Sequence, residues 1–397
     1  MFAIGCVVIC LLEACSHHED HRAIQQTSPL DTTTSLMLQT EWRYNTNYSG
    51  VHLDQRTGRE LIYSGDPKTH LLVRVFDETG AQLFDVPLTP AYDVLDHIHC
   101  LTMVSRDIIA MLDERGEKLV LIDTTGKVIH QQSLREERCD EMGDEYELYP
   151  ANTGITYHGG KLYLGPALLG YCNGKPLYER SGYQEANEKG YFAVSTGKCQ
   201  LAEINLAKQH RNVRFGACGL LRHLTDTPRE TLGMSSTAIA NGSVFVFSQY
   251  CPAIYRIDTA TLSVVDTISI NYQLGPVGIT PPPITQEDLK QGGAEVRSAT
   301  QAYVLSITYD SPSHRYLAAV CHAVDPTTPD EERSWGRNWS LVVLDSTYRK
   351  VNEYVLSGKE YSGSVLLGMK SATWILQKDP DPQGFQKPKV FRRLKLS

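Results

Sequence analysis

Two histidines at alternate positions, His97 and His99, have the spacing that a metal site on a β-strand requires. Side chains two residues apart on a strand point to the same face, so both imidazoles can bind one transition-metal ion if another strand supplies a third ligand. His322 is our candidate for that ligand, because it ends another apolar strand pattern. The alternative is that these histidines bind only water and neighbouring strands, which is the commoner role of such residues.

Residues 136–149 form an acidic stretch that suggests a Ca²⁺ site instead. Calcium prefers oxygen ligands, and Asp140 and Asp144, with Glu141 and Glu145 beside them, would supply these. The spacing matches no EF-hand loop, and a run of charge is more often a solvated surface. Beyond calcium or a transition metal, we expect no cofactor.

A third candidate site combines aromatic rings with arginines. Residues 333–339 read Arg-Ser-Trp-Gly-Arg-Asn-Trp, and a long insertion at 165–198 adds several tyrosines. The ligand-binding candidates of this class are Arg333, Trp335, Arg337, Trp339, Tyr171 and Tyr183. Aromatic faces stack on sugar rings or peptide side chains, and the guanidinium fork binds carboxylates. The alternative is that these rings only pack loops onto the body of the protein.

Motifs of the common enzyme classes do not occur in this sequence. It contains no His-Glu-x-x-His, Gly-x-Ser-x-Gly, phosphate-binding loop, dinucleotide fingerprint or sialidase-type Ser-x-Asp-x-Gly-x-Thr-Trp box. Dispersed carboxylates or a histidine–tyrosine pair would leave no linear motif. We therefore favour a protein without catalytic activity and keep an enzyme as the alternative.

The elements that must position these residues follow a repeat of an apolar strand, a tight turn that begins with Asp, and a second strand. Its clearest copies are 72–88, 119–130, 253–265 and 341–351, and a weaker copy at 199–208 has Asn205 in place of Asp. Short strand patterns fall into groups of four, bounded by Gly, Asn, Asp and Pro. The last group has only three members, and the apolar run 36–44 near the N-terminus has no partner.

This pattern predicts an all-β fold, a six-bladed β-propeller in which the N-terminal strand closes the last blade. Seven blades are the alternative if the insertion at 165–198 contains strands. A two-sheet sandwich is not favoured, because the chain offers too many short strands for one.

The strand order also predicts which face carries the long loops. In an antiparallel blade, the connections between the second and third strands and those between blades leave the same face. The long connections are of these two kinds, at 135–151, 165–198, 271–299, 322–339 and 378–387. Loops carry function more often than the scaffold beneath them, so we expect a ligand to bind at this long-loop face.

Residues 1–15 have the pattern of a lipoprotein signal peptide. A short apolar run ends in Leu12-Glu-Ala-Cys15, similar to a bacterial lipobox, although no Lys or Arg precedes the run and Glu13 is unusual there. Cleavage would leave Cys15 as the lipidated first residue. We expect a flexible polar tether at 16–35 and the propeller at 36–397. The alternative is that residues 1–15 form a buried strand.

The lipobox, the tether and the repeated Asp turns together resemble the six-bladed β-propeller (TolB-like) lipoproteins of unknown function from gut Gram-negative anaerobes. The resemblance covers nearly the whole mature chain, but the turns that carry it are features of the fold. It implies a lipid-anchored protein of the bacterial cell envelope, in the outer membrane and facing the periplasm or the surface. It implies no catalytic residue.

The chain has a formal net charge of −8 and no basic stripe. Nucleic acid is therefore not an expected partner, since phosphate backbones require clustered Lys and Arg. We expect a monomer that acts as a non-catalytic binding or scaffold module for a glycan, a peptide or an envelope protein, and that meets the membrane only through its lipid. The alternative function is a glycan-active hydrolase or lyase with its site on the long-loop face.

Overall fold

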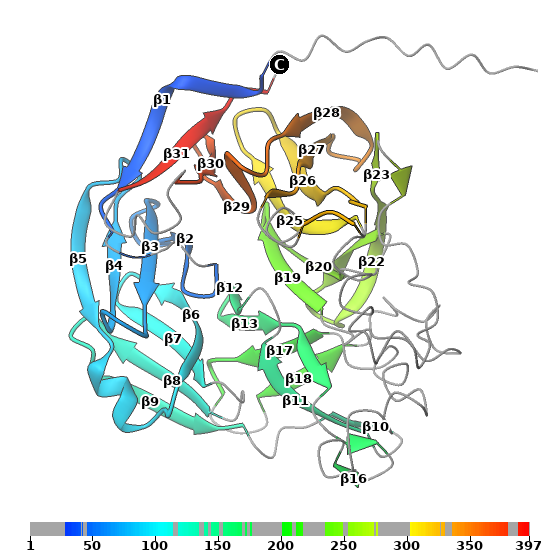
Figure 1. Cartoon of the computed structure of the whole chain (residues 1–397). Coiled ribbons are helices and arrows are strands. Elements are labelled where there is room, and N and C mark those ends of the chain that lie inside the picture. The colour runs from blue at the N-terminus through cyan, green and yellow to red at the C-terminus, as the bar shows by residue number, and fades with distance from the viewer. Residues whose placement is uncertain are drawn as a thin grey trace, which may run out of the picture.

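The computed structural model is a six-bladed β-propeller, as the strand pattern predicts (Figure 1). It describes residues 28–40, 42, 46–113, 118–134, 139–141, 144–150, 154–168, 171–172, 175–176, 201–208, 212–216, 235–248, 253–273, 275–276, 302–325, 327–329, 336–379 and 388–396. Within these ranges six sheets of four antiparallel strands surround one axis, and no seventh four-stranded sheet occurs.

In each of blades 1 to 5, the four strands lie side by side in chain order, the first at the axis and the fourth outermost. Blade 1 contains β2 (Ser49–Leu53), β3 (Glu60–Asp66), β4 (Leu72–Phe76) and β5 (Gln82–Pro87). Blade 2 contains β6 (Ile98–Ser105), β7 (Ile108–Asp113), β8 (Lys118–Asp123) and β9 (Val128–Ser133). Blade 3 contains β12 (Thr156–His158), β13 (Lys161–Leu164), β17 (Leu201–Asn205) and β18 (Val213–Gly216). Blade 4 contains β19 (Ser235–Ala240), β20 (Ser243–Ser248), β21 (Ala253–Asp258) and β22 (Ser263–Ser269). Blade 5 contains β25 (Tyr303–Asp310), β26 (Arg315–Cys321), β27 (Trp339–Leu344) and β28 (Lys350–Leu356).

Blade 6 joins the two ends of the chain. It contains β29 (Tyr361–Gly368), β30 (Thr373–Gln377), β31 (Lys389–Leu394) and, outermost, β1 (Leu30–Leu38). The pairing of β1 with β31 runs from Leu30 opposite Leu394 to Leu38 opposite Lys389. This confirms that the N-terminal strand closes the last blade. The strand begins at Leu30, so residues 30–35 belong to the sheet and not to the tether in which we expected them.

The other described elements lie outside the blades. They are the three-stranded sheet of β10 (Cys139–Glu141), β11 (Asp144–Pro150) and β14 (Pro166–Leu168), the pair β15 (Tyr171–Cys172) and β16 (Lys175–Pro176), the pair β23 (Asn271–Tyr272) and β24 (Gly275–Pro276), and the 3₁₀ turn η1 (Thr89–Asp93). A search of the described residues for a helix long and apolar enough to cross a membrane finds none.

The repeated Asp turns join the two outer strands of the blades. In the turns that begin at Asp77, Asp123 and Asp345, the carboxylate Oδ1 accepts the backbone N–H of the threonine two residues later at 2.9, 2.9 and 2.8 Å. The hydroxyl of the same threonine donates to that oxygen at 2.6, 2.7 and 2.7 Å. Asp suits this position because its short carboxylate can replace a backbone acceptor inside the turn.

A glycine at the end of the turn brings neighbouring blades together. Gly80 and Gly126 have φ angles of 87° and 82°, a region that favours glycine. A Cβ on Gly80 would lie 2.5 Å from the Met37 carbonyl oxygen on the outer strand of blade 6. A Cβ on Gly126 would lie 2.4 Å from the Pro87 carbonyl oxygen on the outer strand of blade 1. Each turn therefore packs directly against the outer strand of the preceding blade.

Six clusters of buried apolar side chains form the core, one between each pair of neighbouring blades. The cluster at the closure, for example, combines Leu36 and Leu38 of β1 with Ile62 and Phe76 of blade 1. Each blade thus buries both of its faces against its neighbours, which accounts for strands that are apolar on both sides, such as β7.

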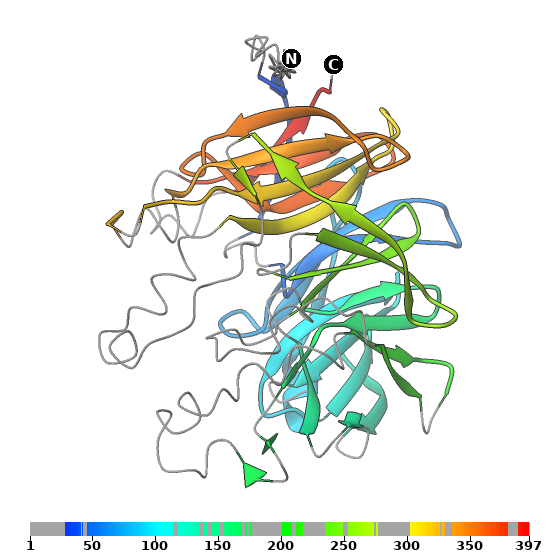
Figure 2. The ribbon, with the colours of Figure 1, turned by 90° about the vertical axis from the view of Figure 1, so that its right-hand side faces the viewer.

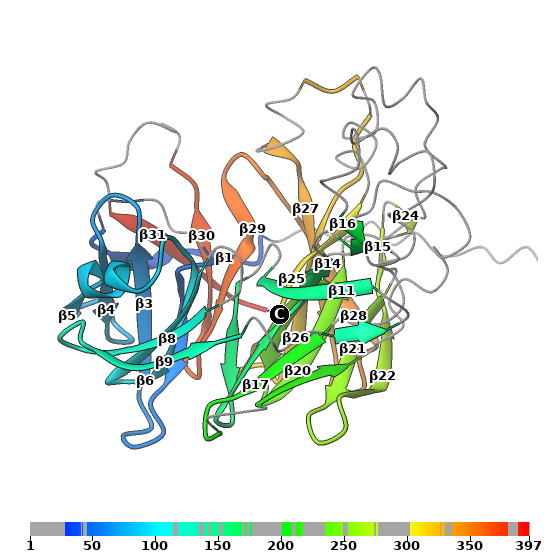
Figure 3. The ribbon, with the colours of Figure 1, turned by 90° about the horizontal axis from the view of Figure 1, so that it is seen from below.

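The two faces of the propeller differ in their connections, as the strand order predicts. The short turns, such as the one between β2 and β3, project to the right in Figure 2 and downward in Figure 3. The first residue of each innermost strand lies at the opposite, long-loop face. The innermost strands β2, β6, β12, β19, β25 and β29 therefore run along the axis from the long-loop face to the short-turn face.

Candidate functional site

A cavity of about 1030 Å³ lies on the propeller axis. The innermost strands of all six blades line it, from residues at their first positions, such as Ser49 and Tyr303, to residues of the short turns, such as Asn241. Its volume is at the upper end of the range that small-molecule sites occupy. The axis thus offers a concave site large enough for a small ligand.

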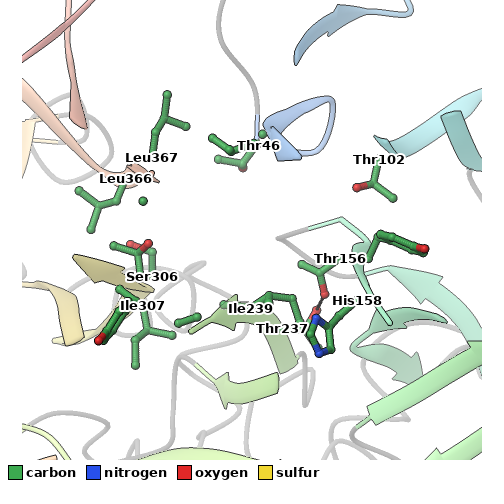
Figure 4. A pocket seen from close by; sticks show the side chains of 18 of the residues that line it. Thr46, Thr102, Thr156, His158, Thr237, Ile239, Ser306, Ile307, Leu366 and Leu367 are labelled. Atoms are coloured by element: carbon green, nitrogen blue, oxygen red, sulfur yellow. Dashed lines mark hydrogen bonds between the residues drawn. The ribbon is translucent and has the colours of Figure 1, made fainter. Parts of the chain in front are cut away.

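The wall of the cavity combines apolar and polar side chains (Figure 4). Ile307 of β25 and Leu366 of β29 present branched aliphatic side chains, with Ser306 beside them. Thr102, Thr156 and His158, from blades 2 and 3, lie across the cavity from them (Figure 4). A ligand on the axis would therefore meet hydrocarbon as well as hydroxyl and imidazole groups.

Several hydroxyl groups of the wall are used to join neighbouring blades. Thr237 Oγ1 of β19 donates to the Tyr163 carbonyl oxygen of blade 3 at 3.3 Å. Ser306 Oγ of β25 donates to the Gly363 carbonyl oxygen of blade 6 at 2.8 Å. These groups stabilise the ring of blades, and a ligand would have to rely on other polar groups.

Three rings, His52, Tyr157 and His158, line the cavity on the side of blades 1 and 3. The rings of His52 and Tyr157 are tilted to each other with centroids 6.1 Å apart. Burial lowers the pKa of His52 and also that of His158. Both imidazoles are therefore neutral at pH 7, and each offers one N–H donor and one nitrogen acceptor.

Among the described residues that line the cavity, Asp, Glu, Lys and Arg are represented only by Glu60 and Lys370. They lie at the short-turn end, where the Lys370 backbone N–H donates to both carboxylate oxygens of Glu60 at 3.0 and 2.8 Å. Burial raises the pKa of Glu60. The described lining thus contains no pair of carboxylates of the kind that glycosidases use.

The histidines of the predicted metal site do not come together on this wall. The strand β6 begins only at Ile98, so the two histidines do not both lie on it. His97 is exposed before the strand, His99 is half-buried within it, and neither lines the described cavity. His322 is buried elsewhere, with Nε2 2.8 Å from Ser340 Oγ and its ring stacked on Tyr272. Among the described residues, no group of three or more His, Cys, Asp or Glu could hold a metal ion.

Trp339 and Arg337 are internal residues, which corrects the expectation that they belong to an exposed binding platform. Trp339 begins β27, is 1% exposed and donates from Nε1 to the Tyr361 carbonyl oxygen at 3.2 Å. Arg337 is 8% exposed and donates from Nε to the His322 carbonyl oxygen at 2.9 Å. Its guanidinium lies over the Tyr303 ring, 5.5 Å from the centroid.

The structure does not describe four of the other predicted site residues, which are Arg333, Trp335, Tyr183 and Cys15. For Asp140 of β10, Asp144 of β11 and Tyr171 of β15, the structure describes only the strands that carry them. Their assignment to calcium or ligand binding stays a prediction.

Sequence reasoning missed His52, Tyr157 and His158 as lining residues. The available signal was position, because the first strand of every group of four is the innermost one and its side chains face the axis. Applied to all six groups, that rule would have selected the lining.

No protein-family model and no curated protein matches this sequence. Among solved structures, the chain is similar to a member of the DUF4221 family from Bacteroides vulgatus, with a TM-score of 0.63, 13% identity, and coverage of 92% of this chain and 97% of that one. At this identity the similarity shows the fold alone. A protein from Bacteroides fragilis, thought to be exported, matches with a TM-score of 0.44, 10% identity, and coverage of 91% of this chain and 95% of that one. A TM-score of that size supports no conclusion about function.

Proposed function

We propose that this protein is a non-catalytic binding module of the bacterial cell envelope that takes a small ligand, a glycan fragment or a peptide end, into its axial cavity. The observation that carries the proposal is the cavity of about 1030 Å³ with its mixed apolar and polar lining. A wall of this mixed kind is typical of ligand sites, where apolar surface supplies affinity and a few polar groups fix orientation.

The ligand enters from the long-loop face. Ser49, Ser236 and Ser364 line the cavity, and each lies in the first half of its innermost strand, which starts at that face. Trp339 and Arg337, two of the ligand-binding candidates from the sequence, are buried and cannot form an exposed contact surface. The cavity is therefore the main contact surface in this proposal. A scaffold role for an envelope protein partner would use the same face.

A cavity-blocking variant tests this function. Ser364 is exposed, lines the cavity, and has a hydroxyl partner in Ser362 at 3.1 Å. Ser263 on the outer strand β22 is also exposed and has a hydroxyl partner in Thr261 at 2.6 Å. The panel is a set of oligosaccharides, peptidoglycan fragments and short peptides, measured by thermal shift and calorimetry. Ser364→Trp should abolish binding of any hit and Ser263→Trp should preserve it. Binding that both variants preserve, or a panel without hits, would contradict the proposal.

We also propose that Cys15 is lipidated, as in the TolB-like lipoproteins that the sequence resembles. The strand β1 pairs at its start with the end of β31, on the short-turn side of blade 6. The described chain therefore begins on that side of the propeller. Detergent partitioning of the wild type and of Cys15→Ser from a Bacteroides host tests the anchor. Equal partitioning of the two would rule it out.

A glycan-active lyase or hydrolase is the second candidate, and one observation favours it. His52 and Tyr157 face each other across 6.1 Å inside the cavity, and burial lowers the pKa of His52. A neutral imidazole and a phenol can serve as base and acid. Product analysis of every glycan hit decides between the two functions, because only an enzyme releases shorter fragments that a Tyr157→Phe variant no longer forms.

A further inference from the structure

At the short-turn end of β12, the last strand residue projects a polar ring into the axial cavity. This residue is His158, which is half-buried and lines the cavity, and Figure 4 shows its imidazole beside Thr237 and Ile239. No described residue forms a hydrogen bond with the imidazole, and the preceding Tyr157 hydroxyl likewise has no described partner. The hydroxyls of Thr237 and Ser306 differ from these groups, because they donate hydrogen bonds to carbonyl oxygens of neighbouring blades.

The chemical state of His158 restricts the ligand. Burial alone lowers its pKa, and no carboxylate opposes the effect. The neutral ring has one donor and one acceptor, which match an alcohol that both accepts and donates. Such a ring provides no counter-charge for an ion. The other titratable groups of the described lining are His52, Tyr63, Tyr157, Tyr303, Tyr309, Glu60 and Lys370.

The opposite wall supplies a surface for hydrocarbon. Ile307 and Leu366, from blades 5 and 6, line the cavity across from His158, whereas Ile239 of blade 4 lies beside it (Figure 4). A cyclic polyol has the matching shape, because its C–H groups lie on one face and its hydroxyls at the edge. The one lysine of the described lining, Lys370, lies at this end, but its Nζ already donates to the Gly58 carbonyl oxygen at 3.0 Å. A charged ligand would therefore lose its hydration on entry without a free counter-charge, and that loss is costly.

We propose that this end of the cavity binds an uncharged, hydroxylated ring of the pyranose type, whose hydroxyl bonds to His158 and whose C–H face packs on Ile307 and Leu366. The assignment rests on the proposed binding function and names the ligand class for it. It adds His158 and Tyr157 as groups that set specificity for neutral over acidic sugars.

The ligand class is tested with three probes, chosen so that each of the other two differs from the first in one property. They are p-nitrophenyl β-D-glucopyranoside, which is neutral and has an apolar substituent, methyl β-D-glucopyranoside, which lacks the aryl group, and p-nitrophenyl β-D-glucuronide, which adds a carboxylate. Calorimetry with the mature chain gives the dissociation constants. The neutral aryl glycoside should bind, and the glucuronide should bind at least about tenfold more weakly, because its carboxylate is desolvated without a free counter-charge.

Variants of His158 test the residue. His158→Phe keeps the ring and removes both polar atoms, so it should weaken binding of the neutral glycoside by about three- to tenfold, the usual value of a neutral hydrogen bond. His158→Gln, which also donates and accepts, should restore most of the affinity. His130→Phe on the outer strand β9 is the matched control and should leave binding unchanged.

The outcomes separate this inference from the proposed function. Equal binding of the glucuronide, or unchanged binding by His158→Phe, overturns the inference. If Ser364→Trp still abolishes binding in that case, the cavity is the ligand site and only the assignment to His158 fails. If none of the three probes binds at millimolar concentration while another member of the panel does, the ligand class is wrong. If nothing binds at all, the proposed function fails as well.

Discussion

The indole of Trp339 fills the space between blades 5 and 6. It packs in a buried cluster with Leu317 and Leu341 of blade 5 and Ile375 of blade 6. Gly363 of β29 lies against it so closely that a Cβ would be 2.8 Å from the indole Cδ2. The ring is therefore a core residue whose size is matched by a glycine on the adjacent blade.

Replacement of Trp339 by Ala should lower the free energy of unfolding by about 3–5 kcal/mol, because it leaves a large cavity between two blades. Val351→Ala, on the outer strand of the same blade where the side chain is 49% exposed, should change it by no more than about 0.5 kcal/mol. Urea unfolding followed by fluorescence measures both. A small effect at Trp339 would mean that the indole is not packed as described.

Three buried or half-buried histidines, His52, His158 and His322, share one electrostatic property. Burial is the main cause that lowers the pKa of each. In the unfolded chain they titrate near the ordinary value of about 6.5. Below that pH the unfolded state binds protons that the folded state does not, so folding becomes less favourable as the pH falls.

We expect the free energy of unfolding to decrease as the pH is lowered from about 7.5 to about 5.5, in the window set by the unfolded histidines. His322→Gln removes one of the three groups and should make this dependence shallower, whatever its effect at the upper pH. Denaturant titrations at a series of pH values give the slope. A slope that is the same with and without His322 would refute the assignment.

At the scale of the structural element, the turn between the two outer strands also forms the contact between blades. Where the turn of blade 4 has Leu262 with a φ of 56° in place of glycine, the preceding blade has Gly216 on its outer strand. A Cβ on Gly216 would lie 2.8 Å from the Leu262 carbonyl oxygen. The turn of blade 4 therefore approaches the preceding blade closely, as the turns of blades 1 and 2 do. Here the glycine lies on the outer strand of the preceding blade and not in the turn.

Gly126→Ala should therefore be more destabilising than Gly58→Ala. Both glycines have positive φ, 82° and 71°, so the conformational strain is similar. An added Cβ would lie 2.4 Å from the Pro87 carbonyl oxygen at Gly126 and would have nothing within 4 Å at Gly58. The difference between the two melting temperatures isolates the contact between blades, and equal losses would show that the contact is unimportant.

At the scale of the whole molecule, the ring of blades depends on the strand β1. Leu36 and Leu38 of this strand are 2% and 0% exposed, and Lys395 Nζ lies 3.0 Å from Asp31 Oδ2 at its other end. Without β1, the edge of β31 and the cluster between blades 6 and 1 would be open to solvent. Open strand edges favour association between chains.

Removal of residues 1–38 should therefore produce a less stable protein that associates in solution, while removal of residues 1–27 should leave the monomeric propeller intact. Size-exclusion chromatography with light scattering reports the association, and thermal unfolding reports the stability. A stable monomer after the longer deletion would contradict the closure by β1.

The sequence by itself determined the six groups of strands and the closure of the last blade by an N-terminal strand, although it placed that strand at 36–44 and not at Leu30–Leu38. These follow from local rules: strand periodicity, Asp and Gly in the turns, and a last group of three strands with a lone run at the other end of the chain. Each rule involves residues that are close in sequence or that repeat at a fixed interval, so one sequence is sufficient to apply it. The same rules predicted which connections lie on one face.

Only the tertiary structure decided which aromatic and basic residues are free to meet a ligand. Trp339 and Trp335 belong to the same short motif, yet Trp339 is buried because β27 packs between blades 5 and 6. His158, which sequence reasoning did not select, lines the axial cavity because its strand is the innermost one. Burial depends on neighbours hundreds of residues away, such as Gly363 for Trp339, and no local pattern records them.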